Sequence, residues 1–177
     1  MTKNQKSLRI TIILALMVAI SILMGKYLAI RGGDVMRFSL ENTPIILSGI
    51  AFGPVAGALV GIVADLVGCI MVGYTINPLV ALGAVAIGLI SGFMPRILAR
   101  INVNGRLNLA ITVAVAHLIG SVLIKTVGLS SYYDMPFVIL MLWRALNYLI
   151  VGALDGIVVH ILLGHRAIDK QIKELTK

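Results

Sequence analysis

Long apolar stretches separated by short polar connectors dominate this chain, and they constrain its fold more than any other feature. A helix needs about 20 apolar residues to cross the hydrocarbon core of a bilayer, so this length accommodates about six spans. The mean hydropathy of +1.04 and the 12% of charged residues exclude an ordinary soluble domain. We therefore predict an all-α integral membrane protein with six transmembrane helices, forming a single membrane domain over residues 1–177.

The second of these spans is unusually short. The apolar stretch from Pro44 to Phe52 covers only about half of a hydrocarbon core at about 1.5 Å per residue. Gly53 and Pro54 then interrupt the chain, and a proline suits the first position of the next helix. Short helices at membrane depth line cavities in transporters, so we predict that this helix and the first outer loop cap a pocket. The predicted spans cover residues 9–30, 42–52, 54–72, 78–95 (with Pro95 as the end), 107–129 and 136–164.

Basic residues cluster in three connecting or terminal regions. Cytoplasmic segments of membrane proteins carry an excess of Lys and Arg, which places these regions and both termini in the cytoplasm. The net charge of +8 then has a topological explanation, and we predict no nucleic-acid partner. The connectors at about 26–43, 73–77 and 130–135 face outward, where a substrate arrives. The clustered residues are Lys3, Lys6 and Arg9; Arg96, Arg100 and Arg106; and Arg166, Lys170, Lys173 and Lys177.

Polar side chains within the spans are few, and such groups are costly in a membrane unless they are satisfied. On a helix that advances about 100° per residue, Arg144, Asn147 and Asp155 fall on one stripe of the last span. Arg144 and Asn147 lie at a depth comparable to Lys125 in the preceding span. We predict that they share an outward-opening cavity. The alternative is a structural ion pair from Arg144 to Asp155 or to Asp65.

Gly57, Gly61 and Gly68 fall on one face of the third span, where small residues predict close helix packing. Asp65 lies on the same face and therefore points toward the packed interior and away from lipid. It either contacts a ligand or serves as a structural carboxylate.

Aromatic residues near the outer side form the belt expected at a membrane interface, which explains Tyr74. Tyr148 lies beside the polar stripe, and we predict that it stacks on a flat heterocycle.

The first outer loop is crowded with charged residues and leads directly into the short helix. Arg37 fits a site in this loop better than Arg31, which suits a solvated surface. The complete set of predicted ligand-binding residues is Lys26, Arg37, Glu41, Asn42, Asp65, Asn77, Lys125, Arg144, Asn147 and Tyr148.

Motifs of enzymes are missing from the sequence. The segment from Gly120 to Thr126 superficially resembles a phosphate-binding loop, but Ile124 occupies the position of the glycine that must precede Lys125. Cys69 is the single cysteine, which excludes an intrachain disulfide, and no metal-ligand spacing surrounds it. We expect no ATPase site or other enzymatic activity, no metal and no cofactor.

Over nearly its whole length the chain resembles the folate-specific substrate-binding component (S component) of energy-coupling factor (ECF) transporters. The residues that carry the resemblance are the run Arg37-Phe38-Ser39-Leu40-Glu41-Asn42, then Pro44, Phe52-Gly53-Pro54, Gly57, Gly61 and Ala64-Asp65. The resemblance implies a multi-pass subunit of the bacterial plasma membrane that captures folate outside and releases it inside. Release would occur when the subunit is docked on a transmembrane coupling subunit and two ATPase subunits.

The resemblance also assigns roles to individual residues. Ala15 and Ala19 form an Ala-x-x-x-Ala pair that is similar to the surface this family uses for docking on the coupling subunit. In the pocket, Asn147 is expected to meet the edge of the pterin and Tyr148 to stack on it. The cations expected to neutralise the two folate carboxylates are Lys26, Arg37, Lys125 or Arg144.

Two alternative functions are left open by the sequence. One is an S component for another vitamin. The other is a stand-alone transporter in which Asp65, His117 and Asp155 relay protons across the membrane.

Overall fold

The computed structural model describes residues 3–32, 36–134 and 136–176. Over these residues the chain is almost entirely helical, which confirms the predicted all-α membrane fold. One short antiparallel hairpin is added in the first loop, where β1 (Ile30–Gly32) pairs with β2 (Met36–Phe38) and Ile30 lies opposite Phe38. Five helical segments of the described chain are long and apolar enough to cross a membrane. A shorter apolar helix, Asn42–Phe52, corresponds to the predicted short second span.

The helices are α1 (Lys3–Ile22), which continues into the π-helical turn η1 (Leu23–Tyr27); α2 (Asn42–Phe52); α3 (Pro54–Met71); α4 (Pro78–Arg100); α5 (Gly105–Ala116), which continues through the π-helical segment η2 (His117–Ile124) into α6 (Lys125–Tyr133); α7 (Phe137–Gly164); and α8 (Arg166–Thr176). The short second helix and the start of the third at Pro54 match the prediction.

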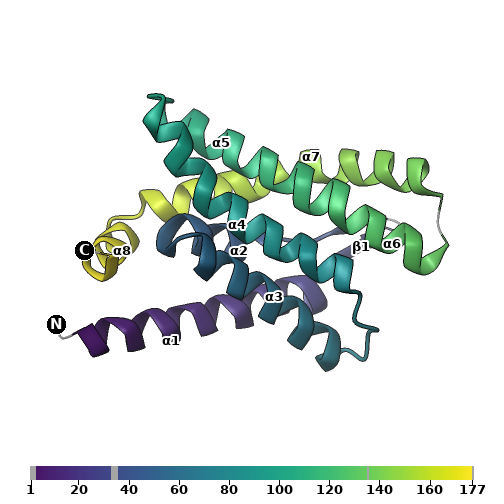
Figure 1. The fold of residues 1–177 in the computed structure, drawn as a ribbon, viewed down its shortest axis with the longest axis horizontal. Coiled ribbons are helices and arrows are strands. Elements are labelled where there is room, and N and C mark those ends of the chain that lie inside the picture. The colour runs from purple at the N-terminus through teal and green to yellow at the C-terminus, as the bar shows by residue number, and fades with distance from the viewer. Residues whose placement is uncertain (1–2, 33–35, 135, 177) are drawn as a thin grey trace.

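The centre of the bundle forms where α2 and α3 pack against α4 (Figure 1). Glycines allow this close approach, since a Cβ atom added to Gly88 of α4 would lie 2.1 Å from the backbone of Gly57 in α3. Ile46, Val60 and Ile87 fill the core beside this contact and are almost fully buried. The predicted packing of small residues along one face of the third span is therefore what brings these helices together.

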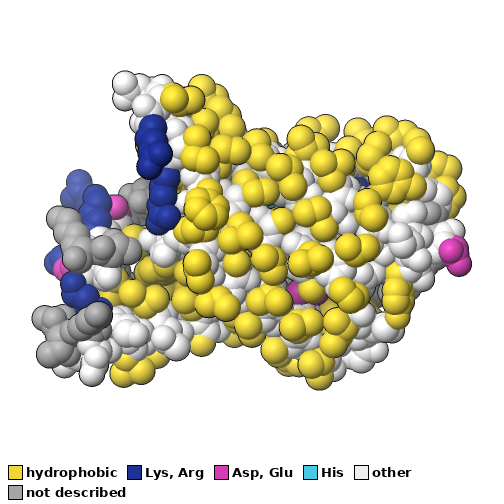
Figure 2. Space-filling view, viewed as in Figure 1, with side chains coloured by type: hydrophobic (Ala, Val, Ile, Leu, Met, Phe, Trp, Pro, Cys, Tyr) yellow, Lys and Arg dark blue, Asp and Glu magenta, His cyan; other side chains and the backbone are white. Residues whose placement is uncertain are grey.

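Both ends of the described chain lie at one end of the bundle (Figure 1). Lys and Arg side chains gather at this same end, while hydrophobic side chains cover the body of the molecule (Figure 2). This arrangement agrees with the shared cytoplasmic side inferred from the basic clusters. The basic C-terminal tail predicted from the sequence forms helix α8 (Arg166–Thr176).

Four predicted boundaries differ from the helices of the structure by three residues or more. The first helix begins at Lys3 rather than at residue 9, and α6 extends the fifth span to Tyr133 rather than to residue 129. The first span ends at Tyr27 in a π-helical turn rather than at Ile30, which belongs to β1.

The fourth span does not end at Pro95, because α4 continues through it to Arg100. A proline inside a helix lacks the N–H that would bond the carbonyl four residues earlier, here that of Ser91, and its ring crowds that carbonyl. Transmembrane helices nevertheless tolerate proline. Asn108 Nδ2 of α5 donates to the Pro95 carbonyl at 3.0 Å and ties α4 to α5 at this point.

Candidate ligand-binding site

A cavity of about 210 Å³ lies at the end of the bundle opposite the described termini. Its walls come from the ends of α1 and α3, the start of α4, the segment after β2, and the facing parts of α6 and α7. The structure brings most of the predicted ligand-binding side chains together around this space. Those that line it are Lys26, Glu41, Asp65, Asn77, Lys125, Arg144, Asn147 and Tyr148.

Two predicted site residues are not among the lining residues. Asn42 is fully buried at the start of α2, and its side-chain nitrogen and oxygen have no hydrogen-bond partner among the described residues. The backbone of Arg37 lies in β2, but its side chain is outside the described part of the structure. Tyr74, expected from the sequence to belong to an interfacial belt, lies on the cavity wall. Its position in the connector after the third span gave no sign of this.

Lys125 reaches the cavity because α4 has no side chain in its path. A Cβ atom added to Gly83 of α4 would lie 2.5 Å from Lys125 Cγ, so the glycine provides the space for the lysine stem. Lys125 is only 4% exposed, and its Nζ lies 3.4 Å from Glu41 Oε1. An ammonium this deeply buried requires such a counterion. The pair also links α6 to the first loop.

Lys26 enters the cavity from the π-helical turn that ends the first span. Its stem lies over Gly68 of α3, where an added Cβ atom would be 2.8 Å from Lys26 Cε. The ammonium Nζ lies 3.5 Å from Cys69 Sγ and 5.6 Å from the centre of the Tyr74 ring. Lys26 makes no ion pair among the described side chains, so its charge faces the cavity with only weak partners.

Arg144 is held in place by an irregularity in the preceding helix. At the end of η2 the Lys125 N–H bonds the carbonyl of Gly120, five residues back, instead of the carbonyl of Ser121. Arg144 Nε and Nη2 donate to this Ser121 carbonyl at 3.2 and 2.8 Å. The guanidinium also lies 5.3 Å from the centre of the Tyr148 ring, within the range of a cation–π contact. Irregular turns of this type are frequent at functional sites.

A second buried polar cluster lies behind the cavity, and its contacts differ from the alternative that the sequence left open, an ion pair between Arg144 and Asp155. Asp155 Oδ2 lies 2.9 Å from His117 Nε2, and the Thr43 hydroxyl donates to the other carboxylate oxygen. The His117 ring stacks on Tyr148 with 5.1 Å between ring centres. A buried carboxylate needs such partners, and these also fix Tyr148 from behind. Asp155 and His117 do not line the cavity that contains Asp65.

Two amide side chains line the cavity in different ways. Asn77 caps α4, since its Oδ1 accepts from the Leu79 N–H at 3.0 Å, and its Nδ2 donates to the Gly128 carbonyl at 2.8 Å. Its polar atoms therefore join α4 to α6. Asn147 lies on the buried stripe of α7 that also contains Val151, as the helical periodicity predicted.

The cavity combines three cations, two carboxylates, amides and tyrosine rings in one small space. This composition suits binding of a polar, anionic, partly aromatic molecule through charge-assisted hydrogen bonds and stacking. No group of three or more His, Cys, Asp or Glu side chains that could hold a metal ion occurs within the described ranges.

Comparison with known proteins gives a family and a fold. Residues 5–170 match the family described as "ECF-type riboflavin transporter, S component". A search of curated proteins found no match.

Three solved structures share the architecture. FolT bound with folic acid aligns with a TM-score of 0.68 and 18% identity, over 91% of this chain and 93% of that chain. The S component for biotin from an ECF-type ABC transporter aligns with a TM-score of 0.67 and 18% identity, over 93% of this chain and 95% of that chain. The S component of a bacterial ECF transporter aligns with a TM-score of 0.64 and 20% identity, over 91% of this chain and 94% of that chain. At these identities the likeness shows a shared fold and leaves the ligand open.

Proposed function

The chain belongs to the S components of ECF-type transporters, and we propose that the vitamin it binds is folate. S components are the substrate-binding membrane subunits of vitamin transporters, and they dock on the ECF module. The protein is therefore a multi-pass membrane transport subunit and not an enzyme. We further propose that it captures folate from the outside and depends on a coupling subunit and two ATPase subunits for inward release.

The convergence of Lys26, Lys125 and Arg144 on one cavity is the observation that carries the folate proposal. Folate ends in a glutamate with two carboxylates, whereas biotin has one carboxylate and riboflavin has none. Three cations facing two resident carboxylates leave a positive excess that favours an anionic ligand. Lys26 is the clearest candidate for a ligand carboxylate, because it makes no ion pair among the described side chains.

The rest of the cavity suits the pterin end of folate. A pterin presents ring nitrogens, an amino group and a carbonyl along its edge, which require both donors and acceptors. Asn147 supplies both kinds of group, and Asp65 supplies acceptors. Tyr148, fixed between His117 and Arg144, offers an aromatic face for stacking. FolT bound with folic acid is one of the structures that share this fold.

The size of the cavity predicts a change on binding. A volume of about 210 Å³ is below the roughly 300–1,000 Å³ of most small-molecule sites. We therefore expect the long side chains of Lys26 and Lys125 to swing aside when folate enters.

Isothermal titration calorimetry of the purified protein with folate, riboflavin, biotin and pteroate tests the ligand assignment. We expect folate to bind most tightly, and pteroate, which lacks the glutamate, to bind about tenfold or more weakly than folate. In Lys26→Met the affinity for folate should fall toward that for pteroate. Tighter binding of riboflavin or biotin than of folate would move the assignment to that vitamin.

Docking on the ECF module is proposed to use the exposed face of α1. Ala15 and Ala19 are both exposed there, beside the exposed Leu16. Small residues let another helix approach closely, so Ala15→Trp should abolish co-purification with the coupling subunit. Folate affinity should not change, since Ala15 lies about 16 Å along the helix from Lys26.

Val138→Trp is the matched control, because Val138 is an exposed apolar residue of α7. It should preserve both the complex and folate binding. Full recovery of the complex with Ala15→Trp would show that docking uses a different surface.

A further inference from the structure

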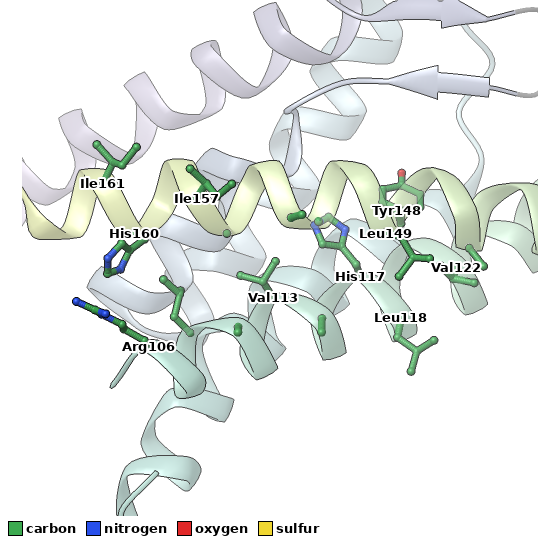
Figure 3. Close-up of a pocket in the computed structure, with 17 residues that line it drawn as sticks. Arg106, Val113, His117, Leu118, Val122, Tyr148, Leu149, Ile157, His160 and Ile161 are labelled. Carbon is green, nitrogen blue, oxygen red and sulfur yellow. The ribbon is translucent and has the colours of Figure 1, made fainter. Parts of the chain in front are cut away.

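A second and larger hollow lies between α5 with η2 on one side and α7 on the other (Figure 3), and one residue of its lining, Tyr148, also lines the folate cavity. Its volume is about 720 Å³, and it is open along one side. Its walls are almost wholly apolar. Small residues form much of its surface, namely Ala110 and Ala114 from α5 and Gly152, Ala153 and Gly156 from α7. We call this hollow the α5/α7 groove.

The groove is long enough to hold a hydrocarbon chain. It extends from Arg106 to Val122, which is about 24 Å along a helix at about 1.5 Å per residue. Because apolar and small residues line it along this length, a chain of methylene groups finds van der Waals contacts with both helices.

One end of the groove is polar and cationic. Arg106, at the start of α5, and His160, on α7, lie at the same end in Figure 3. Both side chains are exposed and neither has a hydrogen-bond or ion-pair partner among the described residues. This end belongs to the basic end of the bundle, where membrane-protein topology places the cytoplasmic headgroups (Figure 2).

From this combination we infer that the α5/α7 groove binds one anionic phospholipid of the cytoplasmic leaflet. One acyl chain lies along the small residues between α5 and α7, and the phosphate group meets Arg106 and His160. Basic sites between transmembrane helices on the cytoplasmic side are typical places for such headgroups. Apolar contacts along the chain and charge complementarity at its end together retain the lipid.

A larger side chain at Gly156 should block the groove. A Cβ atom added there meets no heavy atom within 4 Å, so the side chain of Gly156→Leu starts in open space and extends into the groove. Gly164 is the matched control on the same helix, since it is equally open but does not line the groove. Ala110→Leu fills the groove from the α5 side and serves as a second blocking variant.

Native mass spectrometry of protein released from nanodiscs made of equal parts dioleoylphosphatidylcholine and dioleoylphosphatidylglycerol tests the inference. We expect one phosphatidylglycerol to remain bound to the wild-type protein and to Gly164→Leu. Its retention should fall about tenfold in Gly156→Leu and in Ala110→Leu, because several methylene groups lose their contacts. Arg106→Gln combined with His160→Gln should lower it about fivefold, whereas Arg100→Gln should not.

Equal retention in the wild type and in both blocking variants would overturn the inference. Displacement of the bound lipid by inorganic phosphate alone would also overturn it, because the site would then recognise the free anion and not the chain. Loss of the coupling subunit from Gly156→Leu with unchanged lipid retention would instead assign the groove to a protein partner. Folate affinity, measured in the same samples, should be unaffected throughout.

Discussion

Replacing Arg144 by alanine is expected to weaken folate binding by about 10- to 100-fold. Hydrogen bonds to charged groups contribute about 1.5–3 kcal/mol, and about 1.4 kcal/mol corresponds to a tenfold change in affinity. The substitution removes a cation from the cavity and also frees Tyr148, which the guanidinium holds at 5.3 Å. Titration calorimetry with folate measures the change directly. Asn147→Ala should weaken binding as well, since it removes a paired donor and acceptor from the cavity wall.

Two further variants make this result interpretable. Arg144→Lys retains the charge but loses the fork of donors that contacts the Ser121 carbonyl, so it should recover only part of the affinity. Arg100→Ala removes an exposed arginine at the far end of α4 and should leave binding unchanged. Equal loss of affinity in Arg144→Ala and Arg100→Ala would show that the cavity is not the site.

The substitution Gly88→Leu is expected to prevent folding. An added Cβ atom would lie 2.1 Å from the backbone of Gly57, and neither helix backbone can move aside without separating α3 from α4. We expect this overpacking against a backbone to lower the free energy of unfolding by more than about 4 kcal/mol, which is exceptional for a single mutation. Size-exclusion chromatography should show aggregated protein or none.

The control for this substitution is Gly164→Leu, which adds the same side chain where no atom lies within 4 Å of the new Cβ. It should elute as a single species and unfold at the wild-type temperature. Indistinguishable thermal unfolding of the two variants would contradict the close approach of α3 and α4.

One helix boundary and one helix face that depend on residues close together in the sequence were predicted correctly. The Gly53-Pro54 break correctly separated α2 from α3, because glycine and proline act on their own backbone. The periodicity of α7 correctly placed Asn147, Val151 and Asp155 on its buried face, since side-chain direction follows from the helical repeat.

Features that depend on contacts between distant segments could not be predicted in this way. Asp155 shares a helix stripe with Arg144, but it bonds His117, 38 residues earlier in the chain. The π-helical turn that presents the Ser121 carbonyl to Arg144 has no signature in a single sequence. Pro95 was read as a helix end from its own chemistry, whereas α4 continues through it and Asn108 of α5 donates to its carbonyl.

The glycines show the same difference between features set by neighbouring residues and features set by contacts between distant segments. Their positions along the helix faces correctly indicated close packing. The space that Gly68 and Gly83 leave for the stems of Lys26 and Lys125 became evident only from the fold. In this protein, glycines of the packed helices thus also make room for the cations of the cavity.

A structure of the protein determined with bound folate tests the central claim most directly. We expect the ligand in the cavity between α1, α3, α6 and α7, with its glutamate carboxylates near Lys26, Lys125 and Arg144 and its pterin against Tyr148. The two lysine side chains should have moved from their ligand-free positions. Folate bound outside this cavity, or with its carboxylates directed away from all three cations, would contradict the proposal.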